Sequence, residues 1–198
     1  MKRLCYVLAI CVMFCFVGST VYAETKIGAD WFYGKDAYVL DDWQSPSCAN
    51  TVNRLSFRYE TNELFPSLEN LFIGGEFRYS RYKADELPGG CYYSEHPGHD
   101  AGFIDHGLNL TFRYEIADVF YVGWFMGMSY WLDRDHGMHN LGGSHWLGTW
   151  GPMIGKDWKI YKSWSVRTEL RISHMSDPWE SDRGKNHGEI GIGITYTF

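Results

Sequence analysis

The residues best suited to chemistry lie near the end of the chain, in the stretch from Trp164 to Ser176. Apolar and polar residues alternate there with period two, which is typical of a strand with one apolar and one polar face. His174 and Ser176 continue the apolar face. Residues i and i+2 of a strand lie about 7 Å apart on the same side, so an imidazole base and a hydroxyl nucleophile can meet there. Such a pair serves acyl transfer from an ester when a third group orients the histidine.

The beginning of the chain has the pattern of a secretory signal peptide. Lys2 and Arg3 precede an apolar run, and the small residue Ala23 stands before Glu24. The run is short for a helix that spans a membrane. We therefore expect residues 1–23 to be removed and residues 24–198 to form one domain.

The composition of the remaining chain favours a membrane β-barrel. Aromatic residues make up 18% of the sequence, glycines number 22, and helix-favouring runs are scarce. The net charge is −6 and no basic cluster is present, which argues against a nucleic-acid partner. A secreted chain that is rich in aromatic residues and alternates with period two points to strands that cross a membrane.

Eight alternating segments are expected to be strands, and the connections between them are alternately long and short. An even number of strands with this alternation is typical of barrels in the bacterial outer membrane, and the C-terminal Tyr-Thr-Phe resembles their sorting signature. The predicted fold is all-β, an eight-stranded antiparallel transmembrane β-barrel of the bacterial outer membrane. The predicted strands span residues 25–34, 51–60, 71–81, 103–116, 119–131, 144–156, 164–176 and 188–198.

The predicted strands also assign an inside and an outside to the barrel. Eight strands leave an interior that side chains fill, so we do not expect a pore. With both termini in the periplasm, the seventh strand runs outward and carries His174 and Ser176 to the lipid face at the height of the outer leaflet. Charged residues that face inward are expected to pair there, namely Arg54, Arg58, Glu76, Arg78, Arg113, Glu115, Arg167 and Glu169.

Of the five cysteines, Cys48 and Cys91 remain after removal of the signal peptide. Both fall in predicted surface loops of an oxidising compartment, where they can form one disulfide, and two free thiols are the alternative. Residues 95–100 and 133–139 contain histidines and acidic residues, but no spacing of four ligands supports a metal site there. We expect neither a metal nor another cofactor.

The sequence His-Met-Ser at 174–176, on the penultimate strand of an eight-stranded barrel, resembles the His-x-Ser motif of the lipid A 3-O-deacylases, the PagL-like family. In that family a loop with Asn-x-Gly and a glutamate follows, and this chain has Asn-His-Gly at 186–188 and then Glu189. The resemblance covers the C-terminal quarter, and elsewhere it extends only to architecture and size. It implies an esterase in which Ser176 is the nucleophile, His174 the base and Glu189 the acid.

The resemblance further assigns Asp177, Asn186 and Gly188 to the oxyanion site and its loop, with two departures from the family pattern. The family usually has Asn after the serine, whereas Asp177 brings a negative charge that opposes an oxyanion. Glu189 follows Asn-x-Gly one residue early, and in a regular strand its parity points it into the barrel unless a bulge restores its reach. The alternative acids are Asp177, Glu180 and Asp182.

Two functions of different classes follow. The first is an outer-membrane hydrolase that removes an ester-linked 3-O acyl chain from lipid A, with lipopolysaccharide and membrane lipids as its partners. The second is a non-enzymatic barrel of the OmpX/Ail type whose surface loops bind host or envelope partners. In that case His174 and Ser176 are polar residues near the interface, where each costs only about 0–1 kcal/mol. A lipid A palmitoyltransferase is disfavoured because no amphipathic helix precedes the first strand. A homodimer is left open.

Overall fold

The computed structural model describes residues 24–36, 50–65, 67–84, 102–117, 119–132, 145–176, 178–179 and 185–198. The predicted signal peptide at 1–23 and the predicted disulfide partners Cys48 and Cys91 lie outside these ranges. No helix within the described part of the chain is long and apolar enough to cross a membrane.

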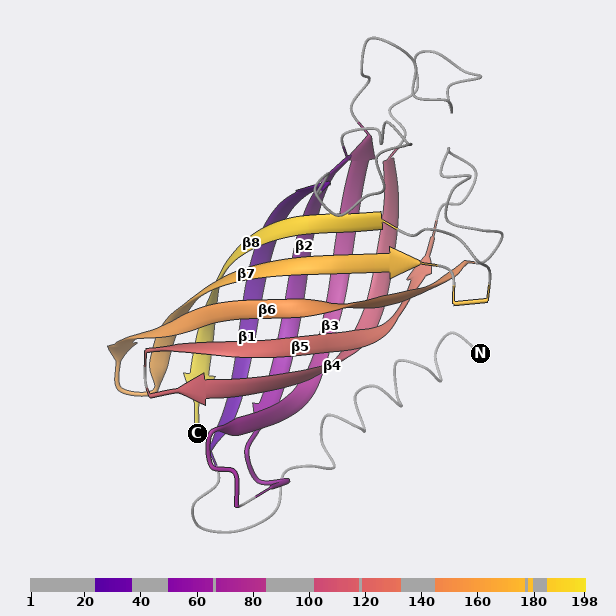
Figure 1. The fold of residues 1–198 in the computed structure, drawn as a ribbon. Coiled ribbons are helices and arrows are strands. Elements are labelled where there is room, and N and C mark those ends of the chain that lie inside the picture. The colour runs from indigo at the N-terminus through magenta and orange to yellow at the C-terminus, as the bar shows by residue number, and fades with distance from the viewer. Residues whose placement is uncertain are drawn as a thin grey trace, which may run out of the picture.

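Eight antiparallel strands close into a barrel, in which every strand pairs with the next and the last returns to pair with the first (Figure 1). The predicted fold is therefore confirmed. Lys26 pairs with Thr197, so the first strand starts at the same end of the barrel at which the last strand finishes. The strands are β1 (Thr25–Asp36), β2 (Asn50–Thr61), β3 (Leu71–Ala84), β4 (Gly102–Ile116), β5 (Phe120–Trp131), β6 (Trp146–Tyr161), β7 (Trp164–Ser176) and β8 (Lys185–Thr197).

β6 is longer than predicted. It continues through Asp157 to Tyr161, and the turn to β7 shrinks to residues 162–163. The reason lies inside the barrel, where the Asp157 carboxylate accepts hydrogen bonds from Arg113 and Arg167 at 2.9 and 2.7 Å. A charged residue that reads as part of a turn in the sequence is thus an inward position of a strand.

The side chains alternate between a polar interior and an apolar exterior. Along β7, for example, Arg171 is 2% exposed whereas its neighbour Leu170 is 55% exposed. In a closed barrel the backbone amide and carbonyl groups of every strand form hydrogen bonds with the two neighbouring strands. An apolar outer wall can therefore face hydrocarbon without unpaired backbone groups. The chain is therefore an outer-membrane β-barrel. Because short turns of such barrels face the periplasm, the end with the turns at 62–70, 117–119 and 162–163 is periplasmic.

Ion pairs fill the lumen. Arg58 donates to Asp30 and Glu169 at 2.8 and 2.7 Å, and Arg171 donates two hydrogen bonds to Glu76 at 2.9 and 2.5 Å. All of these side chains are buried, which confirms that the inward charges pair. The network also takes in residues that the sequence analysis did not name for it, namely Lys26, Asp30, Glu60, Asp105, Asp157, Arg171 and Glu189.

An apolar cluster lies inside the barrel near its outer end. Val52, Tyr82, Trp131, Leu147 and Met175 form one buried cluster in which no member is more than 5% exposed. The Tyr82 hydroxyl donates to the Met175 sulfur at 3.0 Å. Since Met175 is the residue between the predicted base and nucleophile, this cluster supports the inner side of the strand that carries them.

Candidate functional site

His174 and Ser176 lie on the outward face of β7, near its outer end. Both side chains are partly exposed, whereas Met175 between them is fully buried. Their positions differ by two residues, so their Cα atoms are about 7 Å apart along the strand. The hydroxyl and the imidazole thus share one patch of the barrel wall at the height of the outer leaflet.

Asn186 is the residue that holds the His174 ring. The two residues are direct cross-strand partners, and His174 Nδ1 lies 2.9 Å from Asn186 Oδ1. Because the amide oxygen accepts, Nδ1 is the donor and Nε2 carries the lone pair. Asn186 occupies this position because β8 starts at Lys185, earlier than the predicted start at Gly188. The residue predicted for the oxyanion loop is instead a strand residue beside the imidazole.

Trp150 packs on the other side of the imidazole. It is the cross-strand partner of His174 on β6, and the two ring centroids are 4.8 Å apart. A second indole, Trp124, stacks on Trp150 at 5.6 Å between centroids with an interplanar angle of 15°. The histidine is therefore fixed between an amide on β8 and an aromatic pair on β5 and β6.

Two outward-facing glycines leave notches in the wall beside the site. Gly148 is the cross-strand partner of Ser176, and among the described residues a Cβ there would meet the Ser176 carbonyl at 3.6 Å and Pro178 at 3.9 Å. Gly188 pairs with Ile172, and a Cβ there would meet no atom of the described residues within 4 Å. Within the described residues, these notches leave room for an extended apolar chain beside the hydroxyl.

The β6–β7 ladder is interrupted just below the site. Pairing runs to Trp150 and His174 and resumes at Met153, with Gly151 and Pro152 between. Pro152 has no amide hydrogen to donate. At Gly151 a Cβ would lie 1.8 Å from the Ile172 carbonyl oxygen, so only glycine allows this close approach of the two strands.

The structure corrects the assignment of Glu189 as the acid beside His174. Glu189 points into the lumen, where it is 3% exposed, accepts a hydrogen bond from Arg54 at 2.7 Å and accepts another from Ser173. The parity of β8 causes this, because Glu189 follows Gly188 on a regular strand and takes the opposite face. The wall of the barrel therefore separates its carboxylate from the imidazole.

The remaining predicted site residues divide into those that the structure describes and those that it does not. Gly188 lies on the outward face, one pleat from Asn186. Asp177, Glu180 and Asp182 lie outside the described residues, as do the histidine-containing segments 95–100 and 133–139. Among the described residues no group of three His, Cys, Asp or Glu side chains is arranged to hold a metal ion.

Sequence reasoning missed Trp150 and Gly148 as parts of the site. Both were predicted on the β6 segment, but their contacts with His174 and Ser176 depend on the cross-strand register. The available signal was the alternation of Trp146, Gly148 and Trp150, in which a glycine interrupts an aromatic face.

No family model matches the chain, and no curated protein sequence matches it. Among solved structures, the chain is similar to Neisserial surface protein A (NspA), with 15% identity, 91% of this chain and 100% of that chain covered, and a TM-score of 0.48. It is similar to the outer membrane protein Ail of Yersinia pestis, with 15% identity, 89% and 99% covered, and a TM-score of 0.47. It is also similar to the outer membrane protein OprG of Pseudomonas aeruginosa, with 14% identity, 89% and 97% covered, and a TM-score of 0.42.

Proposed function

We propose that the protein is an outer-membrane serine esterase that removes an ester-linked 3-O acyl chain from lipid A. Ser176 is the nucleophile, His174 the base and Asn186 the residue that orients the base. The observation that supports this proposal most directly is the 2.9 Å contact between His174 Nδ1 and Asn186 Oδ1 on the lipid-facing wall. That contact leaves Nε2 of the imidazole with the lone pair that a general base needs.

The reaction follows the usual course of serine acyl transfer. Ser176 Oγ attacks the ester carbonyl carbon while its proton passes to Nε2 of His174. The tetrahedral adduct breaks its bond to the sugar oxygen, which takes the proton from His174 and leaves as a hydroxyl. Water then attacks the acyl-serine through the same proton transfer, and the fatty acid and free Ser176 are released.

Asn186 takes the place that a carboxylate holds in Ser-His-Asp triads. An amide fixes the tautomer and the orientation of the ring, as in Cys-His-Asn sites, but it adds no negative charge. The Trp150 face, 4.8 Å from the imidazole centroid, stabilises the cationic ring of the transition state by about 0.5–1 kcal/mol. Asp177 and Gly188 are assigned to the oxyanion site, where the negative charge of Asp177 opposes the oxyanion.

The second candidate is a non-enzymatic barrel whose surface loops bind host or envelope partners. One observation favours it: in the described part of the chain, the hydrogen-bonding partner of His174 is an amide rather than a carboxylate. In this case the contact between His174 and Asn186 gives each of these polar side chains a hydrogen-bonding partner at the membrane interface and has no chemical role.

Mass spectrometry of lipid A from cells that express the wild type, Ser176→Ala or His174→Ala tests the proposal. We expect the wild type alone to yield lipid A that lacks one hydroxyacyl chain. Thr168→Ala, which removes an outward hydroxyl from the same strand far from His174, is the matched control and should behave as the wild type. Heat-modifiable migration in gels checks that each variant is folded. If cells that express the folded wild type yield unchanged lipid A, the esterase proposal is rejected and the non-enzymatic binding barrel is the remaining candidate.

A further inference from the structure

Lys156 is an unusual residue of the lipid-facing wall. It lies on the outward face of β6, between the apolar outward residues Ile154 and Trp158. Lys35 and Arg81 are also exposed on the outward face, among the strand residues whose side chains the structure describes, and both lie at the outer end of the barrel. Lys156 alone of these stands in the periplasmic half, where an ammonium next to hydrocarbon needs an anionic partner or access to the headgroup layer.

The neighbours of Lys156 direct its ammonium group toward the interface. Nζ lies 4.4 Å from the centroid of the Trp158 ring, one pleat nearer the periplasm. The Trp158 indole is itself held in place, because its Nε1–H donates to Thr168 Oγ1 at 3.0 Å. Asp157 offers no compensation, since its carboxylate is turned to the opposite face and bonded to Arg113 and Arg167.

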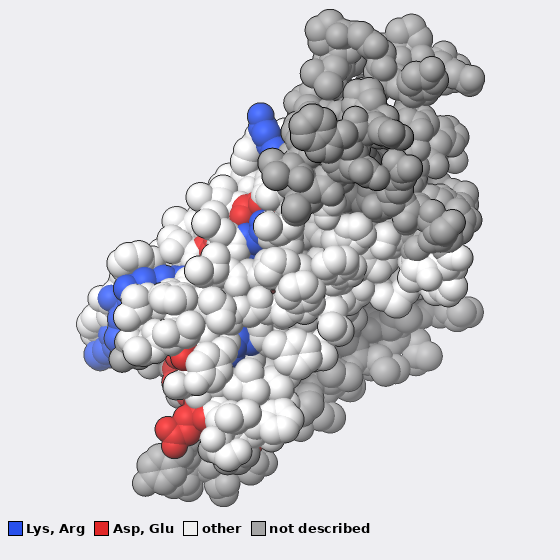
Figure 2. Space-filling view, viewed as in Figure 1, with Lys and Arg blue, Asp and Glu red and all other residues white. Residues whose placement is uncertain are grey.

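Two further lysines lie on the same hairpin. Lys159 is exposed at the end of β6, on the strand face opposite to Lys156, and Lys162 in the turn has its Nζ 5.0 Å from the Tyr161 ring centroid. Together with Lys156 they form what we call the hairpin patch, the blue surface at the left of Figure 2 over the β6–β7 hairpin of Figure 1. Within the described residues, no ion pair joins these three lysines to a carboxylate.

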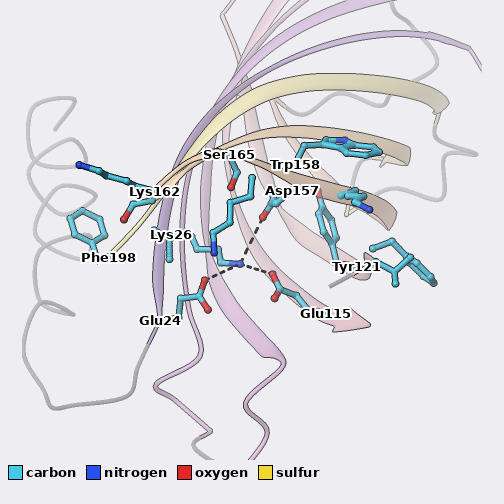
Figure 3. Close-up of a pocket in the computed structure, with 15 residues that line it drawn as sticks. Glu24, Lys26, Glu115, Tyr121, Asp157, Trp158, Lys162, Ser165 and Phe198 are labelled. Carbon is cyan, nitrogen blue, oxygen red and sulfur yellow. Dashed lines mark hydrogen bonds and ion pairs between the residues drawn. The ribbon is translucent and has the colours of Figure 1, made fainter. Parts of the chain in front are cut away.

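The hairpin patch borders a pocket of about 570 Å³ at the periplasmic mouth of the barrel (Figure 3). The fourth lysine of this pocket, Lys26, differs from the other three. Its Nζ lies 3.3 Å from Glu24, 2.5 Å from Glu115 and 3.8 Å from Asp157, so its charge is neutralised within the protein. Phe120 and Phe198 add apolar surface to the same pocket. An anionic ligand with an apolar part therefore matches the uncompensated lysines and the aromatic rim.

We propose that the hairpin patch binds the headgroup phosphate of an anionic glycerophospholipid from the periplasmic leaflet. Lys156 contacts the phosphate from the barrel wall, Lys159 and Lys162 contact it from the periplasmic side, and the acyl chains follow the apolar face beside Trp158. Each lysine near an anionic lipid surface contributes about 1 kcal/mol, which corresponds to about fivefold in affinity. The site is independent of His174 and Ser176, which lie at the other end of the wall.

Native mass spectrometry of the purified full chain tests this proposal. The chain in detergent is mixed with equal amounts of phosphatidylglycerol and phosphatidylcholine that carry identical acyl chains. We expect the wild type to retain phosphatidylglycerol preferentially, and Lys156→Gln to lower that preference about fivefold. Lys156→Arg should keep it, and a triple variant that also contains Lys159→Gln and Lys162→Gln should abolish it.

A matched control removes two charges from the outer end of the same wall, through Lys35→Gln and Arg81→Gln. This control should keep the lipid preference of the wild type, and gel migration before and after heating verifies the fold of each variant. Equal retention of the two lipids by the wild type would overturn the proposal. So would an unchanged preference in the triple variant, or an equal loss in the control. Displacement of the lipid by millimolar inorganic phosphate alone would also overturn it, because the site would then bind a free anion.

Discussion

Replacement of Glu189 separates the two roles that the sequence and the structure give to this residue. Its carboxylate contacts Arg54 at 2.7 Å, and both side chains are 0% exposed. Ser173 donates to the second carboxylate oxygen. If Glu189 were the acid of a catalytic triad, its removal would abolish lipid A deacylation and leave the barrel intact. In the present structure its removal leaves the Arg54 guanidinium buried in the lumen without its anionic partner.

The magnitude follows from that burial. Removing one partner of a buried ion pair costs about 3–5 kcal/mol, because the other charge stays desolvated. Arg54 keeps hydrogen bonds to Ser80 at 3.0 Å and Tyr82 at 3.3 Å, so we expect the lower end of the range, about 3 kcal/mol, for Glu189→Ala. The double variant Arg54→Met with Glu189→Leu replaces the pair by apolar groups and should recover most of this loss.

Urea unfolding in lipid vesicles, followed by tryptophan fluorescence, measures the free energy of unfolding. Lipid A mass spectrometry on the same variants measures deacylation. We expect the single variant to unfold at lower urea, the double variant to unfold near the wild type, and both to retain activity while folded. A Glu189→Ala barrel that is as stable as the wild type but inactive would refute the lumenal role and restore Glu189 as the triad acid.

Three further predictions concern the site and one turn. Asn186→Ala should lower the rate of deacylation by up to about tenfold, the equivalent of one net hydrogen bond of 0.5–1.5 kcal/mol, and Asn186→Asp should restore the rate. Equal activity of the wild type and both variants would show that Asn186 does not orient His174. Gly148→Leu fills the notch beside Ser176, so it should depress deacylation while unfolding in urea changes by less than about 0.5 kcal/mol; full activity would show that substrate does not pass there. Ala117 has a φ of 47°, so Ala117→Gly should raise the free energy of unfolding by up to about 1 kcal/mol, and a loss of stability would contradict the strain.

The fold was predictable because membrane barrels repeat one rule at every strand. Alternation with period two fixed which residues face lipid, including the outward position of His174 and Ser176 on β7. The same rule predicted the inward direction of Arg54 and Arg167. The predicted end of the sixth strand before Asp157 was wrong. An aspartate near a glycine and two lysines is typical of a turn, and only the contacts of Asp157 with Arg113 and Arg167 inside the barrel show that it belongs to the strand.

The candidate site was only partly predictable, because its contacts cross between strands. The register of β7 with β8 sets Asn186, not Glu189, opposite His174, and a shift of a single residue would exchange their faces. Nothing in the local sequence encodes that register, which depends on where β8 begins. The family resemblance identified His174 and Ser176 on the penultimate strand, but it placed Asn186 in a loop and assigned the supporting role to Glu189, which faces the lumen.

The outward position of Ser176 on a closed wall has a kinetic consequence. A membrane lipid reaches this hydroxyl by lateral diffusion within the leaflet, so the quantity that governs encounter is the mole fraction of that lipid in a two-dimensional phase. Adding an inert amphiphile at a constant amount of lipopolysaccharide therefore slows any reaction at Ser176, whereas adding buffer does not. Rates measured in mixed micelles should therefore be plotted against the mole fraction of lipopolysaccharide at the micelle surface. A plot against its bulk molar concentration will give a different apparent constant for every detergent ratio.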